Sequence, residues 1–136
     1  MIARPVLERD VLILACAISA GIHGALAPGH LEEGTGAAGG FAVSAVLLAG
    51  IAVALTRRVS PLLLIVAGTV LTGLLASYAL AITTGVPVLH PDPEPVEGLA
   101  LFTNAVEIGG LVAAADLLVR PDHTTTTVSR FKGVLV

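Results

Sequence analysis

The chain has 136 residues, of which 55% are hydrophobic and only 12% are charged. Soluble domains usually carry about 25% charged residues, so this chain has too few charges to cover a surface that faces water. Its net charge of −3 gives no reason to expect a nucleic-acid partner. The single cysteine, Cys16, excludes an intrachain disulfide and any Cys-x-x-Cys motif. We therefore expect one small domain whose main contact is a lipid bilayer.

Four apolar stretches follow one another along the chain, at about residues 11–27, 37–55, 61–84 and 97–119. Each approaches the roughly 20 residues that a helix needs to cross the hydrocarbon core. Ser60 and Pro61 suit the N-cap and the first position of the third helix. Apolar and polar residues do not alternate as they do in strands. The sequence predicts an all-α, integral membrane four-helix bundle over residues 1–120 and a flexible cytoplasmic tail over residues 121–136.

The basic residues predict the orientation of this bundle. None lies in the loops at about 28–36 and 85–96, and all seven lie on the other side: Arg4, Arg9, Arg57, Arg58, Arg120, Arg130 and Lys132. Because Lys and Arg gather in cytoplasmic loops, we expect both termini and the short turn at 56–60 to be cytoplasmic. The chain is then a multi-pass protein of the plasma (inner) membrane.

Residues 1–27 also resemble a signal peptide, with Arg4 and Arg9 as its basic region and Ala25-Leu26-Ala27 as a cleavage pattern. Pro28 follows that pattern directly and disfavours cleavage, and the apolar run is long for a signal peptide. We therefore expect this segment to remain as the first helix.

Small residues recur at a spacing of four in the predicted helices. Examples are Ala17-Gly21-Ala25, Gly109-Ala113 and Gly110-Ala114. In lipid, small residues let helix backbones approach closely, and this packing replaces the hydrophobic drive that helices have in water. The spacing predicts compact helix contacts without saying which pairs form them.

Every predicted helix carries a polar side chain at a similar depth. His23, Ser44, Tyr78 and Asn104 lie roughly 6–11 Å from the outer ends of their helices, at 1.5 Å per residue, and Glu107 lies about one turn deeper. Because polar groups that face lipid are expensive, these side chains should point into the bundle. We expect an intramembrane polar network there, in which Glu107 is either paired or protonated.

Cys16, Ser19 and His23 share one face of the first predicted helix. Cys16 is most simply a small core residue. Ser19 lacks an evident base and orienting group, so nucleophilic catalysis has little support. The sequence favours a role other than that of an enzyme.

The two outer loops carry imidazoles and carboxylates with no balancing cation: His30, Glu32, Glu33, His90, Asp92, Glu94 and Glu97. Imidazole and carboxylate together suit Zn²⁺, Cu²⁺ or Ni²⁺ better than Ca²⁺ or Mg²⁺. We predict that such an ion is bound by His23, His30, Glu33, His90 and Glu107. The alternative is a solvated acidic rim whose histidines have no function.

Three functions fit this pattern. The first is metal handling, or service as an accessory to a metalloenzyme. The second is a structural subunit that packs against a membrane-protein partner or a second copy. The third is a proton-coupled or cofactor-binding protein that uses His23 and Glu107. Haem is a poor fit, because His23 and His30 occupy a helix and the turn after it rather than opposite faces of a macrocycle.

Overall fold

The computed structural model describes residues 4–32, 34–86 and 93–120. They form four long helices, α1 (Arg4–Leu26), α2 (Thr35–Arg57), α3 (Pro61–Thr83) and α4 (Gly98–Val119), and the short 3₁₀ helix η1 (Gly29–Leu31). Each of the four is long and apolar enough to cross a membrane. The predicted all-α bundle of four spanning helices is confirmed. The expected tail at 121–136 lies outside the described residues, as do Glu33 and His90.

One helix boundary differs clearly from the sequence prediction. α1 begins at Arg4, whereas the apolar run placed its start at about residue 11. Polar residues do not break a helix, and Pro5 is tolerated because the first turn leaves its missing N–H without a partner in any case. The other boundaries agree within two residues. The predicted cap of α3 is confirmed, because the Ser60 side chain accepts a hydrogen bond of 3.3 Å from the backbone N–H of Leu63.

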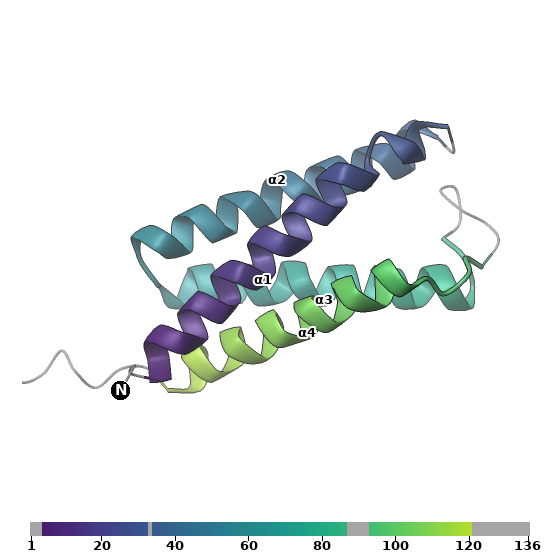
Figure 1. The fold of residues 1–136 in the computed structure, drawn as a ribbon. Helices are drawn as coiled ribbons and strands as arrows, with labels where there is room; N and C mark the ends of the chain where they lie inside the picture. The colour runs from purple at the N-terminus through teal and green to yellow at the C-terminus, as the bar shows by residue number, and fades with distance from the viewer. Residues whose placement is uncertain (1–3, 33, 87–92, 121–136) are drawn as a thin grey trace, which may run out of the picture.

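Successive helices run in opposite directions, so the bundle has two chemically different ends (Figure 1). The start of α1, the turn between α2 and α3, and the end of α4 share one end, with Arg9, Arg57, Arg58 and Arg120. We call it the basic end. The opposite end joins α1 to α2 and α3 to α4, and we call it the acidic end because it carries Glu32, Glu94 and Glu97.

We expect the basic end to face the cytoplasm. Single cysteines at the exposed positions Thr35, at the acidic end, and Val59, at the basic end, test this in a Cys16→Ala background. A membrane-impermeant maleimide added to intact cells should label Thr35→Cys alone, and Val59→Cys should react only after the membrane is opened. Labelling of Val59→Cys in intact cells would reverse the orientation.

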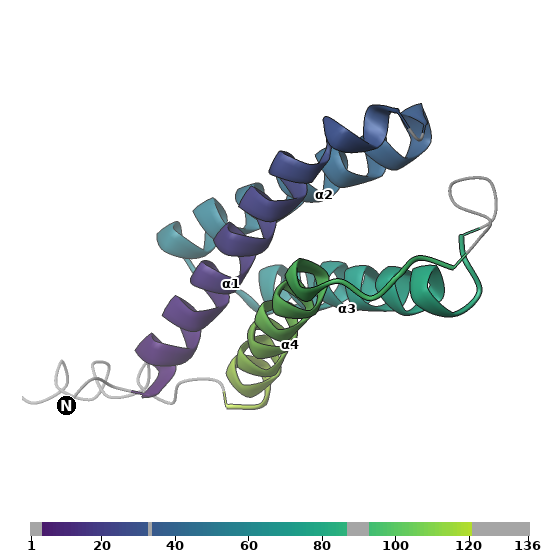
Figure 2. The ribbon, with the colours of Figure 1, turned by 45° about the vertical axis from the view of Figure 1, so that its right-hand side comes forward.

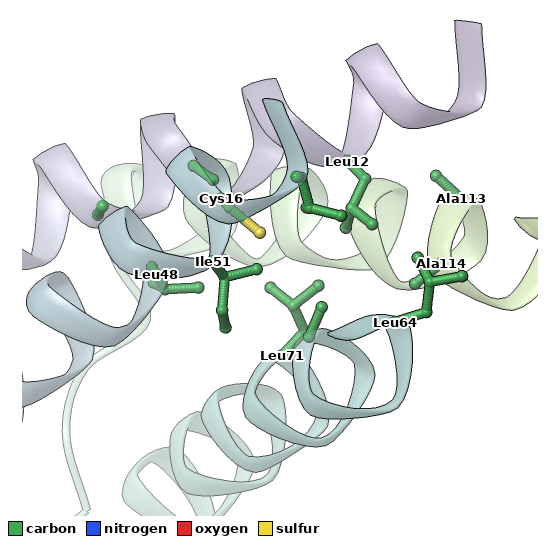
Figure 3. Packing of buried hydrophobic residues seen from close by; sticks show 12 residues of the cluster. Leu12, Cys16, Leu48, Ile51, Leu64, Leu71, Ala113 and Ala114 are labelled. Carbon is green, nitrogen blue, oxygen red and sulfur yellow. The ribbon is translucent and has the colours of Figure 1, made fainter. Parts of the chain in front are cut away.

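Most of the hydrophobic core lies in the half of the bundle near the basic end, and Figure 3 shows how its side chains pack together. α1 packs against both α2 and α4, whereas α3 packs mainly on α4 and has little contact with α2. All four helices contribute to one buried cluster, which includes Leu12, Cys16, Leu48, Ile51, Leu64, Leu71, Ala113 and Ala114. These buried contacts hold the four helices together.

Gly110 marks a close approach of α4 to α1. A Cβ atom built on Gly110 would lie 2.8 Å from the Cβ of Ala15 and 3.2 Å from Cδ1 of Leu71. A Cβ on the neighbouring Gly109 would meet no atom within 4 Å. Of the two small-residue pairs predicted on this helix, Gly110-Ala114 therefore lies in the interface, while Gly109 is exposed on the outer surface.

The helices form two pairs that separate toward the acidic end, α1 with α2 and α3 with α4 (Figures 1 and 2). The last buried residue of α1 is Ala20 and that of α3 is Leu71, while the first of α4 is Thr103. Within the first pair, contact continues beyond this level, since the Cβ position of Gly24 lies 3.6 Å from Ala45. The divergence is therefore between the pairs and not within α1 and α2.

Candidate functional site

Three polar side chains meet where the two helix pairs begin to separate. The Ser19 hydroxyl of α1 donates a hydrogen bond of 2.6 Å to Oε1 of Glu107 on α4. Ser19 is fully buried and Glu107 is only 2% exposed. Nδ1 of His23, which is half-buried, lies 2.9 Å from the backbone carbonyl of Ser19 and 3.3 Å from its hydroxyl oxygen. We call Ser19, His23 and Glu107 the Glu107 network.

The partners in this network fix the direction of its hydrogen bonds. A carbonyl oxygen can only accept, so Nδ1 of His23 must carry the hydrogen and Nε2 holds the lone pair of the neutral ring. The Ser19 hydroxyl can then accept from Nδ1–H while it donates to Glu107. The length of 2.6 Å is that of a short O–H···O hydrogen bond. The two bonds of the Ser19 hydroxyl can therefore run from His23 to Ser19 and from Ser19 to Glu107, while Nδ1–H of His23 also donates to the backbone carbonyl of Ser19.

Local helix geometry explains why these residues meet. Ser19 and His23 are four residues apart, and such residues are neighbours on one face of a helix. Glu107 lies three residues before Gly110, and Ser19 lies four residues after Ala15, so the network is about one turn from this close approach of the two backbones. Because α1 and α4 are so close there, the short serine side chain can reach the carboxyl group.

A second imidazole lies nearby at the acidic end. His30 folds back over the end of α1, and its Nδ1 lies 2.9 Å from the backbone carbonyl of Leu26. Phe41 of α2 contacts both histidines, with ring centroids 4.1 Å from His30 and 5.5 Å from His23. The aromatic ring joins the two imidazoles into one surface at the acidic end.

The other residues of the predicted polar network are not hydrogen-bonded to Glu107. The side-chain amide of Asn104 donates to the backbone carbonyl of Ala100 in its own helix, at 2.7 Å. The Tyr78 hydroxyl is enclosed and has no hydrogen-bond partner in the described part of the chain. Ser44 is half-buried. The structure thus joins His23 to Glu107, through the hydroxyl of Ser19 rather than by direct contact.

The predicted metal site gains no support from the described residues. Among them, no group of three His, Cys, Asp or Glu side chains is placed to hold a metal ion. Two of the five predicted ligands, Glu33 and His90, lie outside the described residues. His23 and Glu107 are separated by a hydroxyl that bonds to both, which gives them a geometry other than that of two ligands on one ion. Metal binding stays a prediction from the sequence.

Comparisons with known proteins add no assignment to this site. No protein-family model, no curated protein and no solved structure matches the chain. What stands is a small membrane protein with four candidate spans and one buried carboxyl group that is hydrogen-bonded between helices. Its function must be inferred from that geometry.

Ser19 is the residue of this site to which the sequence interpretation gave no role. A serine in an apolar helix has little predictive value, because it often bonds only to its own backbone. Its position on the helix could have indicated its role, since Ser19 shares a helix face with His23 and Cys16. A polar residue one turn from an intramembrane histidine is a better candidate than an isolated serine.

Proposed function

We propose that this chain is a proton-coupled membrane protein. In this proposal Glu107 binds and releases a proton inside the bilayer, and Ser19 and His23 connect it to the water at the acidic end. The observation that carries the proposal is the unbroken series of hydrogen bonds from the half-buried imidazole of His23 to the buried carboxyl group of Glu107. The coupled process is the movement of a solute or a change in a membrane partner.

Each transfer in this path balances in protons. A proton from water binds Nε2 of His23, and the imidazolium donates its Nδ1 proton to the Ser19 oxygen. Ser19 passes its own hydroxyl proton to Oε1 of Glu107, which becomes a neutral acid. One proton has then moved inward, and His23 is left as the neutral tautomer with its hydrogen on Nε2. The ring returns to its first tautomer when Nδ1 gains a proton and Nε2 loses one. The release of the proton runs through the same groups in reverse.

Energetics favour this role over simple adhesion between helices. On insertion scales, a charged side chain at the centre of a spanning helix costs about 2.5–3.5 kcal/mol. Hydrogen bonds between helices in a membrane contribute about 0.6 kcal/mol on average. One bond from Ser19 does not offset the cost of the carboxyl group, and a serine or asparagine at position 107 would hold the helices together at lower cost. Unlike a serine or an asparagine at this position, the carboxyl group of Glu107 can gain and lose a charge reversibly.

Infrared difference spectroscopy tests whether Glu107 exchanges protons. Spectra of the protein in lipid membranes are recorded in acidic and in alkaline buffer, and the carboxylic C=O band is followed. We expect a band that grows in acid and is missing from Glu107→Gln. Glu97→Gln is the matched control, because Glu97 is an exposed glutamate at the start of the same helix, and this variant should keep the band of Glu107.

The adhesion hypothesis predicts a different spectrum. If Glu107 served only to bind Ser19, its protonation would be the same in both buffers, and the spectral change would not differ between the wild type and Glu107→Gln. That result would remove the proposed proton coupling.

A further inference from the structure

The bond between Ser19 and Glu107 connects the side chains of two different helices. It is formed by two buried side chains on different long helices, whereas the side-chain bonds of His30, Ser77, Thr103 and Asn104 are made to backbone carbonyls of the same helix or the adjoining turn. It joins α1 to α4, and so it joins the pair α1/α2 to the pair α3/α4. Below it, toward the basic end, the pairs are packed tightly at Gly110 and Ala15.

Above this bond, toward the acidic end, the two pairs separate (Figure 2). On α3, no residue beyond Leu71 along the helix is buried, and α3 as a whole packs mainly on α4. If the two helix pairs moved relative to each other, they would therefore pivot at the contact of Gly110 with Ala15. The Ser19–Glu107 bond lies next to this contact, on the side where the pairs separate.

From this placement we infer that the Ser19–Glu107 bond is a proton-controlled latch between the two helix pairs. The inference rests on the proposed function, because it requires Glu107 to gain and lose a proton. A neutral Glu107 fits the apolar contact and keeps the pairs together. An ionised Glu107 attracts water into the contact, as charges inside membranes do, and the pairs move further apart at the acidic end.

The charge at this contact depends mainly on the protonation of Glu107, because few other titratable groups among the described residues lie near it. Cys16 and His23, both on α1, are titratable groups close to Glu107. Within the described helices, α2 carries only Arg57 at its basic end, and α3 carries only Tyr78, about two turns from Leu71 toward the acidic end. No basic side chain of α2 or α3 is therefore placed to neutralise an ionised Glu107.

Distance measurements between spin labels test the latch. Labels are placed at the exposed positions Ala42 on α2 and Ala79 on α3, in a Cys16→Ala background, and pulsed electron resonance is recorded in acidic and alkaline buffer. We expect the distance to be at least about 2 Å longer in alkaline buffer, a shift at the scale of known helix movements. A control pair near the basic end, at Val53 and Leu118, should keep its distance.

Two variants separate a latch from a passive contact. Glu107→Gln retains an oxygen that accepts from Ser19 and cannot ionise, so its labels should show the short distance in both buffers. Ser19→Ala removes the bond, so its labels should show the long distance in both. Equal distances in both buffers, with a normal infrared change at Glu107, would overturn the latch and leave proton coupling intact. An absent infrared change would remove both.

Discussion

We expect Gly110→Ala to lower the free energy of unfolding by about 1–3 kcal/mol, the usual cost of adding a methyl group to a tightly packed core. The new Cβ atom would lie 2.8 Å from the Cβ of Ala15, a distance that carbon atoms do not adopt without movement of the backbone. Leu71 can move its flexible end, but Ala15 has no such freedom. The loss is measured by unfolding the purified protein in mixed micelles while helix content is followed.

Two further variants make this result specific. Gly109→Ala adds the same methyl group one residue away, where no atom lies within 4 Å, so its stability should equal or exceed that of the wild type. Ala15→Gly removes the opposing Cβ atom and should restore much of the stability when it is combined with Gly110→Ala. Equal effects of Gly109→Ala and Gly110→Ala would show that α1 and α4 are not in contact at this point.

The sequence predicted the four spanning helices well, for a simple physical reason. A span is determined by the length of an apolar run, and length and hydropathy are both properties of the sequence. The start of α1 was the exception, because backbone hydrogen bonds continue through the polar residues that precede the apolar run. The cap of α3 was predictable because Ser60 and Pro61 act within their own turn.

The site was predictable only in part. Depth along each helix correctly brought His23 and Glu107 to one region, although it did not reveal the hydroxyl between them. Depth does not specify how a helix is rotated about its axis. The contact of Gly110 with Ala15 turns the Glu107 side of α4 toward α1, and Asn104 is left to bond to its own backbone. Asn104 shares a face with Glu107 but lies one turn nearer the acidic end, where the helix pairs separate. Both the rotation and the separation depend on close packing between helices, which the spacing of small residues indicates but does not determine.

The proposed path makes its strongest demand on His23. If protons reach Glu107 through this imidazole, His23→Ala should slow the protonation of Glu107 by about 100-fold, the lower end of what a positioned acid or base contributes to a proton transfer. Without His23, the path retains only the hydroxyl of Ser19, and a hydroxyl does not take up protons from water near neutral pH as an imidazole does. The fraction of Glu107 that is protonated at equilibrium should change much less than the rate of its protonation, because His23 carries the proton and Glu107 holds it.

The most direct test is time-resolved infrared spectroscopy of the Glu107 carboxylic acid band after a rapid drop in pH. We predict that the band of the wild type appears quickly, that the band of His23→Ala appears about 100-fold more slowly, and that free imidazole in the buffer restores much of the rate only in the variant. If the band forms at the same rate in wild type and His23→Ala, protons reach Glu107 by another way, and the proposed path through His23 and Ser19 is wrong.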